Sequence, residues 1–223
     1  MKKIETQSLL NLEETIAKNI FDGITYPFEA LPKIKEFIAN TINNLDDEYN
    51  IIDGKIAIHK DAIVSPKSEI VGPVIICANA LIKPFAYIRE NVIIGEYAQI
   101  GNSCELKNSI VFNYAQVPHY NYVGDSIIGY KSHFGAGAIT SNLKSDKTNI
   151  ILKIEGETFE TGLRKFGAIV GDNVEIGCNT VLNPGTIIGR NSNIYPVSCV
   201  RGFIDSNMIY KDRENIIEKQ IKE

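Results

Sequence analysis

Aliphatic side chains recur at every sixth position along two stretches of the chain. The first run holds nine positions without a miss, and the second holds six. A helix repeats one face every three or four residues and a strand every two, so neither produces a strict period of six. A chain that turns a corner after every six residues does. The aliphatic positions are Ile58, Val64, Ile70, Ile76, Ile82, Ile88, Ile94, Ile100 and Leu106, then Val170, Ile176, Leu182, Ile188, Ile194 and Val200.

This period predicts a mostly β protein whose main domain, residues 55–204, is a parallel β-helix. Three short strands make one triangular coil of about 18 residues, and coils stack at the strand spacing of about 4.8 Å. Each aliphatic residue points into the prism, and the residue two positions before it is usually small. The period slips between Phe112 and Val117 and again between Val123 and Ile128, which predicts a bulged wall at both places.

Residues 1–54 lack the period. Apolar residues at three- and four-residue spacing predict two amphipathic helices, Leu12–Phe21 and Leu31–Ile42. We expect them to form an appendage packed on the end of the β-helix, because an open end would expose the core and a strand edge.

Two further segments depart from the repeat. Within residues 144–166, two β-prone runs flank Glu155-Gly156 and predict an inserted hairpin, Asn149–Ile154 with Glu157–Thr161. Residues 205–223 leave the repeat, and their polar composition predicts a short C-terminal helix over Asp212–Lys222.

Composition narrows the class of protein. The chain has 223 residues, and its formal charge of −4 gives no general attraction to nucleic acid or to anionic membranes. No apolar run approaches the about 20 residues of a membrane span, and the first residues lack the apolar block of a signal peptide. We therefore expect a cytoplasmic protein. The cysteines fit no zinc framework and are expected to be free thiols, with no metal bound: Cys77, Cys104, Cys178 and Cys199.

Five ordered segments carry a resemblance to a known family. Four of them resemble the acetyltransferase half of the bifunctional enzymes that make UDP-N-acetylglucosamine. The fifth is similar to archaeal and Bacteroides-type sugar-1-phosphate relatives. The segments are Phe85–Arg89, Glu105–Lys107, His119–Asp125 and Gly135–Leu143, followed by Thr161–Asn173.

The resemblance implies a fold and an activity. The fold is the left-handed parallel β-helix of the hexapeptide-repeat acyltransferases. The activity is transfer of an acetyl group from acetyl-CoA to an amino-sugar 1-phosphate, in UDP-N-acetylglucosamine biosynthesis. Family sites lie between subunits of a homotrimer, which is therefore expected here. No nucleotidyltransferase domain precedes residue 55 and no glycine-rich phosphate loop occurs, so we expect only the acetyltransferase half.

Arg89 and Lys107 are 18 residues apart, which is one full coil. Both directly follow an inward aliphatic residue, so both should point outward on the same face, one strand spacing apart. Two like charges at that distance repel, and an anion between them would relieve the repulsion. In the family, the matching pair binds the sugar phosphate. A solvated pair neutralised by Glu90 or Glu105 is the alternative.

His119 is the candidate general base. Acetyl transfer to an amine needs that amine uncharged and a group that accepts a proton near neutral pH, which histidine provides. The family resemblance assigns the matching histidine this role. A lone surface histidine without a catalytic role is the alternative.

The resemblance also assigns the remaining site residues. Ala136, between Gly135 and Gly137, would polarise the thioester carbonyl through its N–H and so bind the cofactor. Asn142 matches a catalytic asparagine at the acceptor site. The substrate-binding positions are Tyr122, His133, and Lys147 or Lys144, and the further coenzyme A positions are Cys178, Arg164 and Lys165. Two of these depart from the family, since His133 replaces an asparagine and Cys178 a serine.

Two other functions are compatible with the same fold. One is a trimeric scaffold or regulatory subunit without catalysis. The other is a γ-class carbonic anhydrase, which needs three histidines on one metal. This chain has only three histidines, and His59 lies about three coils before His119, so the second alternative is the weaker.

Overall fold

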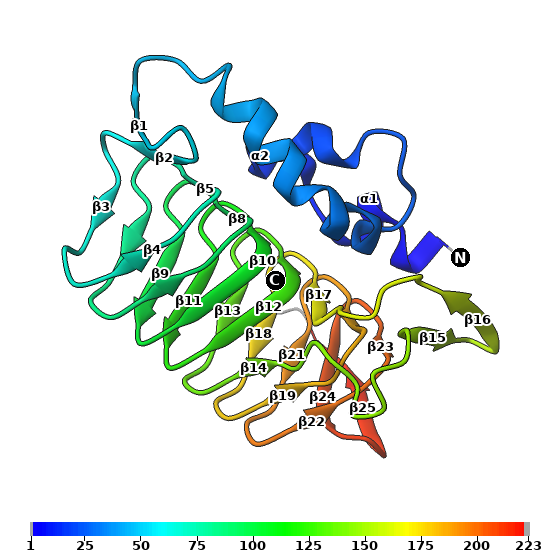
Figure 1. Ribbon diagram of the computed structural model, residues 1–223. Helices are drawn as coiled ribbons and strands as arrows, with labels where there is room; N and C mark the ends of the chain where they lie inside the picture. The colour runs from blue at the N-terminus through cyan, green and yellow to red at the C-terminus, as the bar shows by residue number, and fades with distance from the viewer. Residues whose placement is uncertain (1, 221–223) are drawn as a thin grey trace.

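The computed structural model describes residues 2–220 and shows a stack of three-stranded coils with short helices along one side (Figure 1). The fold is the predicted left-handed parallel β-helix, of about nine turns, with the predicted inserted hairpin. The six-residue positions point into the prism, where side chains such as Ile76, Ile94 and Leu106 are fully buried. Burying such a side chain contributes about 1.5–3 kcal/mol, so the repeat itself accounts for the core.

Wall A is the side of the prism that faces the helices. Its strands pair in parallel with a constant register, so that Ile75 lies beside Ile93. Wall A consists of β2 (Ile56–His59), β5 (Val74–Ile76), β8 (Val92–Ile94), the second half of β10 (Glu105–Val111), the second half of β12 (Tyr122–Ile128), β17 (Ala168–Val170), β20 (Thr186–Ile188) and β23 (Phe203–Ile204).

Wall B follows wall A along the chain. Its strands form a separate nine-stranded sheet, which one antiparallel strand closes at the C-terminal end. Wall B consists of β3 (Ile63–Val64), β6 (Leu81–Ile82), β9 (Gln99–Asn102), β11 (Gln116–His119), β13 (His133–Phe134), β18 (Glu175–Ile176), β21 (Asn193–Ile194) and β24 (Met208–Asp212), and β25 (Asn215–Glu218) closes it.

Wall C completes each coil. It consists of β4 (Glu69–Ile70), β7 (Tyr87–Ile88), the first half of β10, the first half of β12, β14 (Ile139–Thr140), β19 (Val181–Leu182) and β22 (Cys199–Val200). The strands β10 and β12 each continue from wall C into wall A without a break.

The continuous strands coincide with the slips in the period. Inward positions are five residues apart between Leu106 and Val111 and again between Val123 and Ile128. The second slip lies where the sequence predicted it. The prediction for the first slip was wrong, because the shortened step precedes Phe112 and the next step, from Val111 to Val117, has six residues.

The N-terminal appendage contains less regular helix than predicted. It comprises 3₁₀ turns at Lys2–Ile4, Leu12–Glu14, Lys18–Phe21 and Pro27–Lys33, together with α1 (Thr6–Leu9) and α2 (Ile34–Ile42). The prediction of one helix over Leu12–Phe21 was wrong. The hydroxyl of Thr15 accepts the Ala17 N–H at 3.1 Å, and this local bond competes with a continuous helix.

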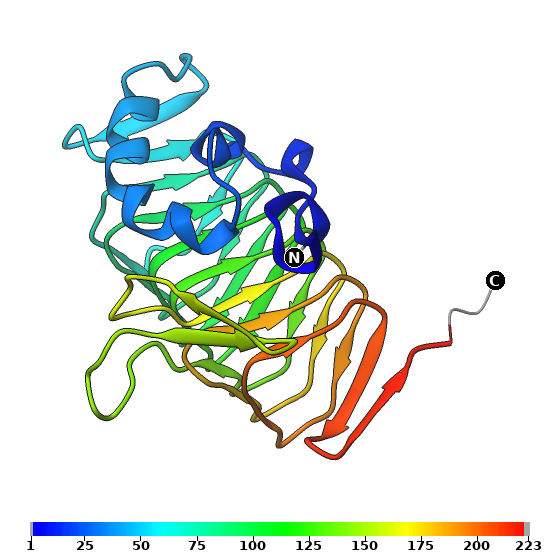
Figure 2. The same cartoon turned by 90° about the vertical axis from the view of Figure 1, so that its right-hand side faces the viewer.

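The appendage lies along wall A rather than on the end of the β-helix, which corrects the expectation (Figures 1 and 2). The physical reason is a stripe of isoleucines, one per coil, that point outward from wall A. All are fully buried beneath the helices, and exposed to water they would form a large apolar patch. The stripe consists of Ile75, Ile93, Ile110, Ile127, Ile169 and Ile187.

The inserted hairpin packs beside the appendage (Figure 2). Its strands are β15 (Ile151–Ile154) and β16 (Glu157–Glu160), which pair antiparallel. On one face, Leu152 and Ile154 are buried in the same apolar cluster as the appendage. The ring of Phe159 meets the ring of Tyr26 edge-on, with centroids 5.7 Å apart. The insertion is therefore held by the N-terminal segment.

Antiparallel strands lie at both ends of the β-helix. At the start, β1 (Tyr49–Ile52) pairs antiparallel with β2. At the other end, β24 and β25 form a hairpin where a helix over Asp212–Lys222 was predicted, so that prediction was wrong over the described residues. Ile216 and Ile217 favour a strand, and the Asp212 carboxylate accepts the Glu214 N–H at 2.9 Å in the turn. Residues 221–222 of the predicted helix lie outside the described residues.

No helix within residues 2–220 has the length and apolar character that crossing a membrane requires.

Candidate active site

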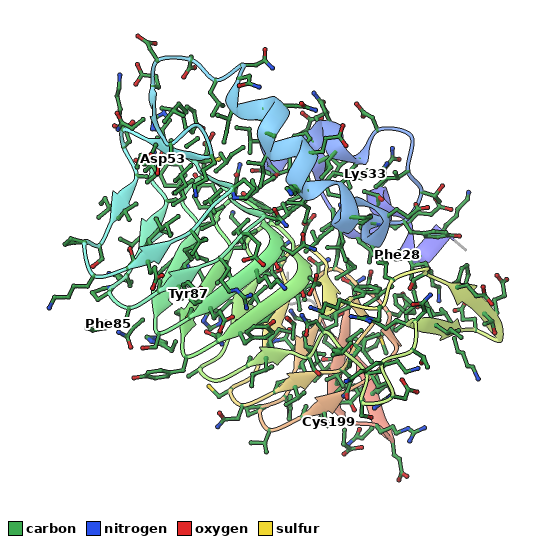
Figure 3. All side chains as sticks on the ribbon, viewed as in Figure 1. Phe28, Lys33, Asp53, Phe85, Tyr87 and Cys199 are labelled. Carbon is green, nitrogen blue, oxygen red and sulfur yellow. The ribbon has the colours of Figure 1, made fainter. Side chains whose placement is uncertain are left out.

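Arg89 and Lys107 lie on the same outer face of wall C in adjacent coils, as predicted. The preceding residues, Ile88 and Leu106, are register partners that both point inward. The Arg89 N–H donates to the Leu106 carbonyl at 2.9 Å, so the two basic residues follow in the same register. The nearby Tyr87 and Phe85 lie on the far side of the β-helix from Phe28 in the appendage (Figure 3).

Two glutamates accompany this basic pair. Arg89 Nη1 donates to Glu105 Oε1 at 2.9 Å, and Arg89 Nε lies 3.5 Å from Glu90 Oε2. Lys107 Nζ lies 3.6 Å from Glu90 Oε1. The hydrogen bond that Arg89 donates to Glu105 raises the pKa of Arg89. Burial opposes ionisation of Glu90, but its own backbone N–H and the charges of Arg89 and Lys107 lower its pKa overall. The four side chains therefore form a balanced charge cluster.

His119, Ala136 and Cys178 occupy equivalent positions at the corner between walls B and C, on three successive coils. The His119 carbonyl accepts the Gly137 N–H at 2.9 Å, and the Ala136 carbonyl accepts the Asn179 N–H at 2.8 Å. These bonds place the three residues in one line parallel to the prism axis. We call this line the corner column. The side chain of His119 is exposed and does not enter the prism.

The backbone of the corner column suits close contact with a ligand. Gly137 has φ of +72°, a left-handed conformation that glycine adopts without strain. A Cβ on Gly135 would lie 2.5 Å from the Cys178 nitrogen, so only glycine allows these coils to approach. The Ala136 N–H is left without an acceptor among the described residues, 2–220.

Tyr122 lies on wall C and Asn142 at the corner between walls C and A, and their side chains are in contact. The Asn142 amide donates to the Tyr122 hydroxyl at 3.2 Å and to Asp125 Oδ2 at 2.5 Å. Asp125 is 6% exposed and also accepts from Asn108 at 2.9 Å. Burial, with the nearby Asp125 charge, raises the pKa of Tyr122, so its hydroxyl keeps its proton at neutral pH. With its NH₂ so engaged, Asn142 has its carbonyl oxygen left to accept a hydrogen bond.

Gly124 provides the space for this contact. It follows Arg89 and Lys107 in the same register, one coil further on. A Cβ at Gly124 would lie 2.5 Å from the Tyr122 hydroxyl and 2.8 Å from the Asn142 amide nitrogen. The residue that follows Arg89 and Lys107 in this register is a glycine because the side chains of Tyr122 and Asn142 occupy the space that a larger side chain would need.

His133 lies apart from this group. It is on wall B, where its Nδ1 lies 3.0 Å from Glu175 Oε2, beside the stacked rings of Tyr97 and Tyr114. Register partners Gln116 and Glu175 flank it along wall B. One chain alone does not bring His133 to Arg89, Lys107 or Tyr122.

The predicted basic residues of the insertion are at its base and in its loop. The backbones of Lys165 and Leu143 form an isolated antiparallel β-bridge, which closes the insertion next to Asn142. Arg164 and Lys147 are exposed, and Lys144 lies 3.3 Å from Asp146. These side chains surround the entry to the insertion without touching the basic pair of wall C.

The histidines are dispersed. His59 is on wall A, His119 at the corner column and His133 on wall B. Over residues 2–220, no group of three His, Cys, Asp or Glu side chains is arranged to hold a metal ion.

Two residues at this site, Asn121 and Asp125, were not predicted from the sequence. Asn121 is at the position two before an inward aliphatic residue, where the other coils of wall C hold Ala, Ser, Thr or Cys. An amide at a position for small side chains was the available signal. Asp125 has φ of +48° at the corner between walls C and A, and no feature of its spacing distinguished it.

Known proteins show similarity to nearly the whole chain. A family model described as the GMPPB C-terminal domain matches residues 70–158. A "Bifunctional protein GlmU" of Methanococcus vannielii is 37% identical over 98% of this chain and 53% of its own length. A "Bifunctional sugar-1-phosphate nucleotidylyltransferase/acetyltransferase" of Sulfurisphaera tokodaii is 34% identical over 78% of this chain and 43% of its own length.

Solved structures give weaker similarity. AntD, an N-acyltransferase from Bacillus cereus solved with dTDP and coenzyme A, is 19% identical over 74% of this chain and 84% of its own length. The TM-score is 0.44, which is too low to support any inference from that structure.

The chain spans about half the length of the curated relatives it matches. The identities and their coverage of this chain confirm the resemblance that the ordered segments predicted. The chain is a homologue of the bifunctional sugar-1-phosphate nucleotidylyltransferase/acetyltransferases, among them the proteins named GlmU.

Proposed function

We propose that the chain is a coenzyme A-dependent N-acetyltransferase that acts on an amino-sugar 1-phosphate. The observation that carries this proposal is the corner column. It aligns an exposed imidazole, His119, with an N–H that has no partner in the described residues, at Ala136. The relatives support the same activity, since one of them is named a sugar-1-phosphate acetyltransferase.

The chemistry assigns each part of the column a role. The amine of the sugar attacks the thioester carbonyl carbon, a C–N bond forms, and the C–S bond to coenzyme A breaks. His119 accepts the proton that the amine loses and returns it to the departing sulfur. The Ala136 N–H donates to the oxygen that becomes negative in the tetrahedral intermediate. Asn142 orients the amine through its free carbonyl oxygen, and Cys178 lines the pantetheine arm one coil further on.

The sugar phosphate binds to Arg89 and Lys107. Its oxygens replace the carboxylates of Glu90 and Glu105, so binding exchanges one set of ion pairs for another. In the free site, the two glutamates neutralise the two cations. A dianion is the favoured ligand, because it pairs with Arg89 and Lys107 at once. Tyr122 donates its hydroxyl proton to the sugar. Lys147 lies near the phosphate, and Arg164 with Lys165 contacts the phosphates of coenzyme A.

A homotrimer completes the site in this proposal. The appendage covers wall A, so walls B and C remain for contacts between copies. If wall B of one copy faces wall C of the next, the neighbouring copy's His133 reaches the phosphate face of Arg89 and Lys107. This arrangement explains why one chain holds the predicted substrate residues on two separate walls.

A scaffold without catalysis remains the competing function. The observation that favours it is the charge cluster, because Glu90 and Glu105 already neutralise the basic pair. Turnover of acetyl-CoA with glucosamine 1-phosphate, followed by release of the coenzyme A thiol, separates the two. We expect turnover in the wild-type protein and a loss of at least about 100-fold in His119→Ala with the oligomer retained. Thiol release that is absent from the wild type would favour the scaffold.

A further inference from the structure

Asn121 is a buried amide that touches both coils of the proposed catalytic machinery. Its side chain is 2% exposed. Its Oδ1 accepts the backbone N–H of His119 at 2.9 Å. Its Nδ2 donates to the Gly135 carbonyl at 2.8 Å and to the Ala138 carbonyl at 3.1 Å, on the next coil. One side chain therefore spans the two segments that carry the imidazole and the Ala136 N–H.

The hydrogen bonds of Asn121 fix the direction of its amide. The two hydrogens face two carbonyl oxygens, and the oxygen faces an N–H, so a flipped amide would oppose like groups at every contact. The Cys104 thiol also lies 3.6 Å from Oδ1, within reach of the second lone pair. A fully satisfied amide in a dry site has little freedom to rotate.

The position is distinctive within the fold. On wall C the other coils place small side chains two residues before the inward position, and these are Ser68, Ala86, Cys104, Ala138, Thr180 and Ser198. Only the coil that holds His119 has an amide side chain at this position of wall C. In the other coils a small residue is enough for packing. The longer polar side chain of Asn121 allows hydrogen bonds both within this coil and to the next one.

We propose that Asn121 is a positioning residue that sets the distance between His119 and the turn bearing Ala136. The inference rests on the proposed function, because His119 and Ala136 gain their roles there. Asn121 touches no substrate. It acts through the backbone on both sides of the reacting thioester, where a displacement of about 1 Å costs about 100-fold in rate.

The test compares Asn121→Ala and Asn121→Ser with a matched control, Ser132→Ala. Ser132 occupies the equivalent small-residue position on wall B and is fully buried. Its hydroxyl joins two coils by donating to the Gly171 carbonyl at 2.6 Å and accepting the Val174 N–H at 3.0 Å. The control therefore removes buried hydrogen bonds between coils without touching the corner column.

We expect kcat to fall about 100-fold in Asn121→Ala, with KM for the sugar phosphate within about twofold of the wild type, because Arg89 and Lys107 are untouched. The serine variant, which restores one hydrogen bond, should recover part of the rate. Ser132→Ala should lower the melting temperature by a similar amount and leave kcat unchanged. A kcat in both Asn121 variants that matches Ser132→Ala would overturn the proposal.

A second readout does not depend on turnover. Hydrogen exchange of the His119 amide should accelerate at least about tenfold in Asn121→Ala and remain unchanged in Ser132→Ala. An unchanged His119 amide would overturn the positioning contact itself. If the wild-type protein transfers no acetyl group, the proposed function is overturned instead. Hydrogen exchange would then still detect the contact between Asn121 and the His119 amide, but that contact would have no catalytic role.

Discussion

Phe28 of the appendage packs against Phe166, the residue that ends the insertion, with ring centroids 5.5 Å apart and planes tilted by 34°. Both rings are buried. This contact joins a segment near the N-terminus to the point where the chain re-enters the β-helix after its excursion. The appendage therefore does more than cover the isoleucine stripe, because it also holds the base of the insertion beside Asn142.

Phe28→Ala should destabilise the protein by about 3–5 kcal/mol, since it removes a buried ring from a packed cluster. Urea or thermal unfolding followed by circular dichroism measures the change. Phe85→Ala is the control, because Phe85 is 61% exposed and its loss should change stability little. Equal effects of the two substitutions would contradict the view that the appendage is an integral part of the fold.

Lys107→Ala should raise KM for the amino-sugar phosphate by about 10- to 100-fold, the loss expected for one charged hydrogen bond. Steady-state kinetics at saturating acetyl-CoA gives the value. Lys60→Ala removes an exposed lysine near the start of the β-helix and should leave KM unchanged. A normal KM in Lys107→Ala would show that the phosphate binds elsewhere.

Glu90→Gln should strengthen binding of the sugar phosphate by about twofold to fivefold, because it removes a carboxylate that competes for Arg89 and Lys107. Calorimetric titration measures the affinity. The same variant tests the charge cluster through pH. Because the folded protein lowers the pKa of Glu90 below 4.5, its ionised form stabilises the fold above that pH.

The difference in melting temperature between the wild type and Glu90→Gln should accordingly be largest above pH 4.5. It should shrink as the pH falls through the lowered pKa of Glu90, where the carboxylate takes up a proton. A difference that grows on acidification would contradict the assigned ion pairs.

The four thiols should react in two classes. Cys178 and Cys199 are exposed and should react promptly with a disulfide reagent. Cys77 and Cys104 are buried, and burial raises the pKa of Cys77 to about 12, so both should react only on unfolding. Coenzyme A should slow the reaction of Cys178, which peptide mapping would locate. Full reactivity of Cys178 in saturating coenzyme A would remove it from the proposed cofactor site.

The sequence predicted the parts of the fold that repeat. A period of six defines inward positions by itself, so the prism and the register of Arg89 with Lys107 followed from spacing. The hairpin within residues 144–166 also followed, because its β-prone runs flank a turn. Contacts between a repeat and a segment without the repeat were harder to predict.

The isoleucine stripe illustrates that difficulty. Ile75, Ile93 and Ile110 were visible as neighbours of inward positions, but only their shared outward direction on wall A shows that they need a cover. The C-terminal strand depended on an open edge at β24, which local polarity does not reveal. Asn121 was recognisable only as an oversized residue among small ones, and its partners lie on another coil.

The antiparallel strands β1 and β25 have a consequence for solubility. Stacked parallel strands are a template on which further copies could add without limit and grow into a fibre. At each end of this molecule, one sheet finishes with a strand that runs the opposite way, so an arriving copy in the native direction finds no matching partner there. The reversal at each end thus acts as a stop against polymerisation along the long axis.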